Sequence, residues 1–128
     1  MSEDLCIVIA DDDPDTVLTL ATLLEQDGHR VYGFGTGREA VAAARMYRAD
    51  VMIVDIQMPD MTGYDIARTV REQMQRSQQP APLLIAISGR WQSETDMLLS
   101  VVVGFDRYFP KPCEPQELLA CLKEWRAS

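Results

Sequence analysis

Short strand-like segments alternate with amphipathic segments along this chain, and that alternation most limits the folds open to it. Apolar runs of this length favour strands that are covered on both faces over core helices. Strands that alternate with helices form a parallel sheet, because each crossover returns the chain to the same edge. The expected strands are residues 5–10, 30–34, 51–54, 83–87 and 107–109, each followed by an expected helix.

Several residues mark where the expected helices begin and end. Asp13 is placed to cap a helix that opens with Pro14, since Asp is a favoured N-cap and Pro fits the first helical turn. Gly28 is expected to end this helix. Thr36 and Glu39 form a capping box for a second, alanine-rich helix that reaches about residue 48. The other helices are expected to begin near residues 62, 92 and 115.

The fold that fits these units is a flavodoxin-like (βα)5 sandwich of the α/β class. Its parallel sheet has the strand order 2-1-3-4-5, with two helices expected on one face and three on the other. At 128 residues the chain corresponds to one domain, residues 1–128. This order places the first and third strands side by side, so residues that follow them meet at the switch point of the sheet.

Composition and charge narrow the classes of function. A net charge of −8 argues against direct binding of nucleic acid or of an anionic membrane. No apolar run is long enough to cross a bilayer, and segment 1–4 carries two acidic residues, unlike a signal peptide. Cys6, Cys113 and Cys121 are an odd number without a metal-binding spacing, which favours reduced thiols and a cytoplasmic location. His29 lies in an expected turn, so we expect it at the surface.

Carboxylates follow the first and third expected strands. Asp11 and Asp12 come directly after the first strand, and Asp55 follows the third, shortly before Pro59 stops any further ladder. Open α/β sheets place their ligands at the carboxyl ends of the strands. Taken alone, Asp55 also fits a turn. Three converging carboxylates repel one another, so without a cation this edge of the sheet is electrostatically strained.

Four short segments at the ends of expected strands carry a shared pattern. They are residues 9–14 (IADDDP), 54–63 (VDIQMPDMTG), 86–89 (AISG) and 106–112 (DRYFPKP). Each is a weak signal alone, but together and in this order they resemble the receiver domain of two-component response regulators, including the chemotaxis regulator. The resemblance implies a signalling switch that catalyses its own phosphorylation and dephosphorylation and is not an enzyme in the ordinary sense.

By this resemblance, Asp55 is the nucleophile that accepts a phosphoryl group from a histidine kinase or a histidine phosphotransfer protein. The implied cofactor is Mg²⁺, with Asp12 and Asp55 as direct ligands, Asp11 as a ligand through water and the Gln57 carbonyl as a further ligand. A hard cation of this kind takes oxygen ligands and keeps several waters. Transfer of a phosphoryl group depends chiefly on in-line positioning and charge neutralisation.

The resemblance also gives roles to residues after the fourth and fifth strands. Lys111 would neutralise the phosphoryl oxygens and Ser88 would donate a hydrogen bond to one of them, whereas a solvated lysine and a strand-end turn are the plain alternatives. Tyr108, with Ser88, would form a conformational switch, although a tyrosine also fits a strand by propensity. A cis peptide between Lys111 and Pro112 is expected, since proline makes that isomer accessible.

The expected output face comprises the fourth helix, the fifth strand and the fifth helix. By the resemblance, it would bind a downstream target or form a phosphorylation-dependent homodimer. Segment 97–103 carries six apolar side chains, more than one inward face of a helix needs, although they also fit a wholly buried core.

Two other classes of function remain open. A receiver-like module that binds a partner without phosphorylation would be expected to lack one of the acids or the lysine, and none is missing. A flavin-binding protein or a phosphatase can share the fold. Flavin binding favours a Ser/Thr/Gly-rich loop after the first strand, where this chain has three acids. An aspartyl-phosphate phosphatase needs an acid two residues after its nucleophile, where this chain has Gln57.

Overall fold

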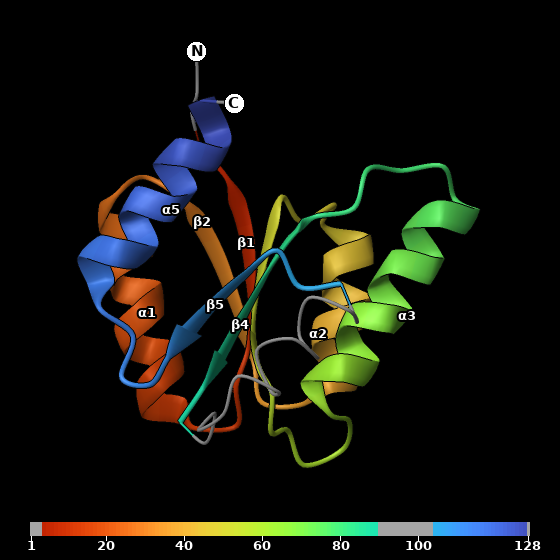
Figure 1. Ribbon diagram of the computed structural model, residues 1–128, viewed down its shortest axis with the longest axis horizontal. Coiled ribbons are helices and arrows are strands. Elements are labelled where there is room, and N and C mark those ends of the chain that lie inside the picture. Colours follow the sequence, from red (N-terminus) through yellow and green to blue (C-terminus); the bar gives the residue numbers. More distant parts are fainter. Residues whose placement is uncertain (1–3, 90–103, 128) are drawn as a thin grey trace.

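A five-stranded parallel sheet forms the centre of the computed structural model, which describes residues 4–89 and 104–127 (Figure 1). The strand order is β2-β1-β3-β4-β5, as predicted. Each strand pairs in parallel with its neighbours, and β1 and β3 lie side by side in the register Ala10 to Val54. The strands are β1 (Cys6–Ala10), β2 (Arg30–Phe34), β3 (Val51–Asp55), β4 (Leu83–Ser88) and β5 (Arg107–Pro110).

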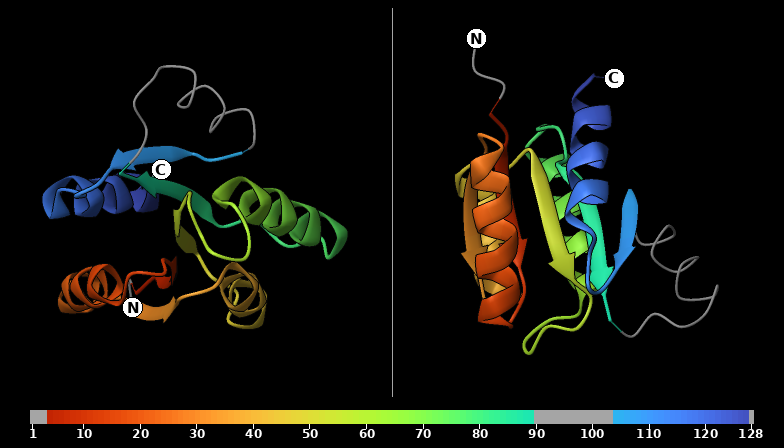
Figure 2. Two further views of the ribbon diagram at one scale, coloured as in Figure 1. Left: turned by 90° about the horizontal axis from the view of Figure 1, so that it is seen from below. Right: turned by 90° about the vertical axis from the view of Figure 1, so that its left-hand side faces the viewer.

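Helices cover both faces of the sheet (Figure 2). The pair α1 and α5 packs on one face and the pair α2 and α3 on the other. The helix predicted from residue 92 to 103 lies outside the described residues, whereas the other two elements of the expected output face, the fifth strand and the fifth helix, are described. Among the described residues no helix is both long and apolar enough to cross a membrane. The helices are α1 (Pro14–Gln26), α2 (Gly37–Met46), α3 (Gly63–Arg76) and α5 (Pro115–Ala127).

The burial of strand β3 on both faces explains why residues 51–54 are all apolar. All five of its residues are buried. Met52 and Val54 pack in the core beneath α2 and α3, whereas Val51 and Ile53 pack in the core beneath α1 and α5. Because side chains alternate along a strand, a strand covered on both faces must be apolar at every position. The run ends at Asp55, where the sheet meets its carboxyl edge.

The predicted caps at Asp13 and Thr36 are present, and Thr62 caps the helix that was expected to begin near it. The side chains of Asp13, Thr36 and Thr62 each accept a hydrogen bond from a backbone N–H in the first turn of their helix. Gly28 follows the end of α1 with a φ of 93°, a left-handed conformation that favours glycine. Helix α2 ends at Met46, earlier than the predicted end near residue 48.

Side chains accept backbone N–H groups at the amino edge of the sheet. Asp50 Oδ2 accepts from the Cys6 N–H at 2.8 Å, and Asp106 Oδ2 accepts from the Leu84 N–H at 2.8 Å. His29 Nδ1 accepts from the Leu5 N–H at 3.2 Å. The prediction of a surface position for His29 was therefore wrong, because this side chain is buried against the start of β1.

Arg71 ties α3 to the segment before β5. Its guanidinium donates to the Gly104 carbonyl, with Nε at 2.8 Å, and lies 3.2 Å from Asp106 Oδ2. Asp106 in turn accepts from the Leu84 backbone. One carboxylate thus joins a helix, the start of β4 and the start of β5. Cys6, Cys113 and Cys121 carry free thiols, as expected.

Candidate functional site

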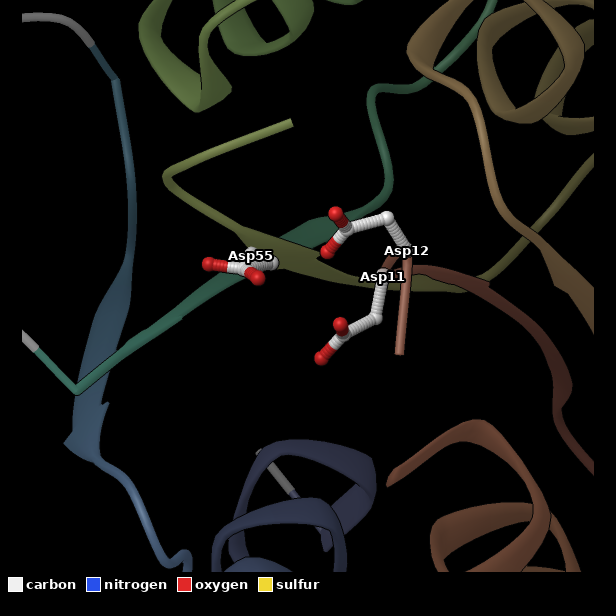
Figure 3. Close-up of side chains that lie close together, drawn as sticks. All are labelled: Asp11, Asp12 and Asp55. Atoms are coloured by element: carbon white, nitrogen blue, oxygen red, sulfur yellow. The ribbon is translucent and has the colours of Figure 1, made fainter. Parts of the chain in front are cut away.

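Three carboxylates meet at the carboxyl edge of the sheet, where β1 and β3 end. Figure 3 shows Asp11 and Asp12 leaving the end of β1 and Asp55 leaving the end of β3. One carboxylate oxygen of each lies within 4.8 Å of the others. Asp11 and Asp55 are buried, whereas Asp12 is exposed. The predicted side-by-side position of β1 and β3 is what brings these residues together.

Asp11 is held in place by hydrogen bonds of both its backbone and its side chain. Its backbone N–H continues the ladder to the Phe34 carbonyl at 3.0 Å, and its Oδ1 accepts from the Asp13 N–H at 3.0 Å. Burial raises the pKa of Asp11, and the nearby charge of Asp55 adds to that rise, while contacts with Lys111 and the Asp13 N–H oppose it. The ionised form of Asp11 is therefore under electrostatic stress in this site.

Asp55 has one oxygen fixed by the backbone and the other turned to the site. Its Oδ1 accepts from the Gln57 N–H at 3.0 Å, which is the local turn expected of an aspartate after a strand. Its Oδ2 lies 3.1 Å from Lys111 Nζ. The backbone behind it is tight, because a Cβ at Gly63 would lie 2.7 Å from Ile56 Cα. The loop after Asp55 can therefore close only with glycine at the start of α3.

Lys111 connects the two buried carboxylates. Its Nζ lies 2.8 Å from Asp11 Oδ2 and 3.1 Å from Asp55 Oδ2. Its backbone N–H donates to the Ser88 carbonyl at 3.0 Å, and the Lys111–Pro112 peptide is cis, which confirms the predicted isomer. Burial alone would lower the pKa of Lys111, but its contacts with the two carboxylates outweigh burial and raise the pKa above its usual value. The side chain is therefore a cation in the site.

The other predicted site residues lie around this centre. Ser88 is buried at the last position of β4, one residue beyond the partner of Asp55 in the register. Gln57 has an exposed side chain, and its residue pairs with Thr62 across the loop that follows β3. Tyr108 is half-buried in β5, opposite Ala86. The roles given to these residues remain predictions.

The acidic cluster fits a divalent cation. Three carboxylates and one ammonium leave a formal charge of −2, and two of the carboxylates are already desolvated. A magnesium ion with bonds of about 2.0–2.1 Å separates opposite ligands by roughly 4 Å. Carboxylate oxygens that all lie within 4.8 Å of one another are therefore close enough to surround one such ion. Which of Asp11, Asp12 and Asp55 bind the ion directly and which through water stays a prediction.

Asp60 was not singled out by the sequence, although it has a well-defined structural role. Its Oδ1 accepts from the Gly37 N–H at 2.7 Å and its Oδ2 from the Arg38 N–H at 3.0 Å. These bonds satisfy two free donors at the start of α2 and lower the pKa of Asp60. The loop after Asp55 is thereby fastened to a second helix. In the sequence, only its position after Pro59 marks Asp60 as a turn residue.

The fold and the residues at the carboxyl edge of the sheet are typical of one class of protein, and a comparison with known families gives the same class. Residues 7–123 match the response regulator receiver domain. The chain therefore belongs to this family, whose members are signalling switches of two-component systems and bind Mg²⁺ at an acidic pocket. This member of the family thus has the expected strand order, an acidic cluster and a lysine beside that cluster.

Particular relatives are similar over most of this chain. The DNA-binding response regulator MtrA of Mycolicibacterium smegmatis is 32% identical over 114 residues, covering 89% of this chain and 47% of MtrA. Response regulator SaeR of Staphylococcus aureus is 33% identical over 113 residues, covering 88% of this chain and 46% of SaeR. The chain thus spans about half the length of these curated relatives.

Solved structures show the same fold. The chemotaxis protein CheY4 of Vibrio cholerae superposes with a TM-score of 0.83 at 29% identity, covering 94% of this chain and 98% of CheY4. A receiver domain described as BeF3-activated DrrB superposes with a TM-score of 0.83 at 26% identity, covering 98% of this chain and 99% of that chain.

Proposed function

We propose that this protein is a phosphorelay receiver that accepts a phosphoryl group on Asp55 from a histidine kinase or a histidine phosphotransfer protein, with Mg²⁺ as cofactor. The observation that carries the proposal is the position of Lys111 Nζ, 3.1 Å from Asp55 Oδ2 and 2.8 Å from Asp11 Oδ2. A carboxylate beside a fixed cation and two further acids is suited to phosphoryl transfer, in which charge neutralisation matters most.

The reaction follows from the groups at the site. An Asp55 carboxylate oxygen forms a bond to phosphorus as the P–N bond of the phosphohistidine breaks, and the electron pair of that bond returns to the imidazole. The Gln57 N–H holds Oδ1 of Asp55, which leaves Oδ2 directed to the reacting group. Lys111 balances the charge on the phosphoryl oxygens, and Ser88 donates to one of them.

A metal bound here would neutralise phosphoryl charge as a Lewis acid. Asp12 and Asp55 would hold it directly, Asp11 through water and Gln57 through its backbone carbonyl. The raised pKa of Asp11 supports this role, because a group that resists ionisation next to other acids is stabilised by an added cation.

The signal would leave the domain as a conformational change on the face formed by the fourth helix, β5 and α5, with Ser88 and Tyr108 as the switch. That face would bind a downstream target or a second copy of the phosphorylated chain. We take residues 1–128 as a single cytoplasmic receiver domain that reads no nucleic acid by itself and associates with no membrane. The net charge of −8 supports both exclusions.

Labelling with acetyl phosphate tests the proposal directly. Wild-type protein with Mg²⁺ is expected to gain one hydroxylamine-sensitive phosphoryl group by intact mass spectrometry, and EDTA should prevent the gain. Asp55→Asn should abolish labelling while its circular dichroism stays that of the wild type. Asp65→Asn, at an exposed ion pair on α3, is the matched control and should label normally. Full labelling of Asp55→Asn would reject Asp55 as the acceptor. A wild-type chain that never labels would favour a module that binds partners without phosphorylation.

A further inference from the structure

A groove lies between α2 and α3, on the face of the sheet opposite α1 and α5. It has a volume of about 720 Å³ and is lined by α2, α3 and the loop before α3. Neither the acidic cluster nor the expected output face includes it. Its walls combine apolar side chains with two arginines and one aspartate, and they include Arg38, Val41, Arg45, Met46, Asp60 and Met61.

Apolar side chains form the floor of this groove. Val41 is buried and Met61 is half-buried against the core beneath α2 and α3. Met46 is 73% exposed, which is the largest exposure of any large hydrophobic side chain in the described part of the protein. An exposed methionine beside an apolar recess is typical of surfaces that bind other proteins, because its side chain adapts to varied partners.

The charge around the groove is opposite to that of the whole protein. The residues that line the groove include two arginines, Arg38 and Arg45, and one acid, Asp60, in a chain with a net charge of −8. Helices α2 and α3 as a whole carry five arginines against three acidic residues. Helix α1, by contrast, contains Asp15 and Glu25 and no lysine or arginine. Arg38 and Arg45 are exposed, and neither forms an ion pair within residues 4–89 and 104–127. Both are therefore available to an acidic partner.

The spacing of these arginines indicates that the acidic partner is a helix. Arg38 and Arg45 lie seven residues apart on one helix, which is about 10.5 Å along its axis, with Val41 between them. A second helix laid in the groove would place acidic residues at i and i+7 opposite the arginines. Its apolar residues at i+3 and i+4 would then face the floor. We infer that this groove binds an acidic amphipathic helix of a partner protein.

The groove is already formed without a ligand. Asp60, which lines it, holds the first turn of α2 through the Gly37 and Arg38 N–H groups. Those bonds fix the loop that carries Met61 against the helix that carries Arg38. A preformed site loses less conformational freedom on binding, which favours the bound state.

A second copy of this chain is the other occupant to consider, because α1 is acidic and its Leu18 is 67% exposed. Such a contact would join α1 of one molecule to the α2–α3 groove of the next. A contact between two different surfaces is heterologous, so it repeats head to tail into a ring or a filament and does not make a two-fold dimer. We therefore assign the groove to a separate partner, and self-association becomes an outcome of the test.

The test uses the full chain and a synthetic peptide of about 18 residues, roughly 27 Å long as a helix. The peptide has blocked ends, one leucine stripe, and glutamates at i and i+7 beside that stripe. A control peptide carries lysines in place of the glutamates. We expect amide NMR shifts confined to α2, α3 and the loop at Met61, with a Kd below about 1 mM for the glutamate peptide. The lysine peptide should bind at least about tenfold more weakly.

Charge reversal in the groove gives the second arm. Arg45→Glu should weaken binding of the glutamate peptide by about tenfold and improve binding of the lysine peptide. Arg76→Glu makes the same charge change on α3 at a residue that does not line the groove, and should alter binding less than about twofold. Dispersed amide spectra for both variants establish that each is folded.

The other outcomes overturn the inference. The inference is wrong if about 1 mM peptide causes no NMR shifts, or if the shifts are confined to α1 and α5. It is also wrong if the two peptides bind equally well, or if Arg45→Glu and Arg76→Glu weaken binding equally. Self-association of the wild-type chain that Arg45→Glu abolishes would assign the groove to a second copy. These measurements need no phosphorylation, so they stand apart from the labelling test of Asp55.

Discussion

The two edges of the sheet use polar side chains in opposite ways. At the amino edge, Asp50, Asp106 and His29 each accept a backbone N–H from the start of a strand. At the carboxyl edge, the oxygens of Asp11 and Asp55 that do not bind the backbone face one another across Lys111. At the amino edge each of these acceptors has its backbone donor within the chain. At the carboxyl edge the group of side chains retains an excess of negative charge.

This difference separates structural from functional acids. A carboxylate that satisfies a buried N–H stabilises the fold, because the donor would otherwise be desolvated without a partner. A carboxylate that faces other carboxylates costs stability until a cation is bound, since burial disfavours its charge. Substitutions at the two edges should therefore change stability in opposite directions, and only one edge should affect chemistry.

The largest effect is expected from Lys111→Met at the carboxyl edge. The variant removes the cation that lies between Asp55 and Asp11, so the rate of labelling by acetyl phosphate should fall by about 10²-fold. Lys123→Met removes an exposed lysine from α5 and is the matched control. The rate is measured by intact mass spectrometry over time. An unchanged rate would mean that Lys111 has only a structural role.

The next effect is expected at the amino edge. Asp106→Ala should lower the free energy of unfolding by about 2 kcal/mol, because the buried Leu84 N–H loses its acceptor and Arg71 loses an ion-pair partner. Asp106→Asn retains an oxygen acceptor and should lose less. Urea unfolding followed by circular dichroism measures both variants. Equal losses would show that charge, and not the hydrogen bond to Leu84, is what matters.

Asp11→Asn should act in the opposite direction. Because the folded-state pKa of Asp11 is raised above its unfolded value, the cost of its charge grows as the pH rises between these two pKa values and is complete above the folded-state pKa. The cost is absent at pH values below the unfolded pKa, where the group is protonated in both states. In EDTA near pH 7 the variant should gain about 1 kcal/mol in its free energy of unfolding. The gain should fade as the pH is lowered through the pKa of Asp11. Asp12→Asn, at an exposed carboxylate, should gain less, and a loss for Asp11→Asn would contradict the predicted repulsion.

The smallest effect is expected away from both edges. Arg68 and Asp65 form an exposed ion pair at 2.9 Å on α3. Arg68→Ala should change the free energy of unfolding by less than about 0.5 kcal/mol, because solvent screens such pairs. The same urea titration measures it. A change as large as that of Asp106→Ala would show that ion pairing in general, and not the amino edge in particular, sets stability.

The sequence was most informative where the signal is local. Alternating strands and helices predicted a parallel sheet that fits the order 2-1-3-4-5, and the caps at Asp13 and Thr36 were predicted from residues at most three positions away. The sheet order then placed Asp11 and Asp55 at the same edge. The cis bond before Pro112 came from family resemblance, and the structure confirms it.

The rest depends on partners far apart in the chain. Asp50 accepts from Cys6, 44 residues away, and Asp106 accepts from Leu84, 22 residues away. A single aspartate near the end of an element looks like any turn residue, so its acceptor role becomes visible only once the strands are in register. His29 was misplaced for the same reason. A lone histidine after a glycine gives no sign that its ring accepts a strand N–H.

The uneven distribution of charge between the two helical layers has a kinetic consequence. Helix α1 carries two acids and no lysine or arginine, whereas α2 and α3 together carry five arginines against three acids, so the molecule has an electric dipole across the sheet. A charged partner is oriented by such a field before contact, which raises the association rate and has less influence on dissociation. Screening at physiological salt acts over about 8 Å, so added salt should slow encounters at both faces. Partners of opposite charge can thus approach opposite sides of one small domain without competing for the same path.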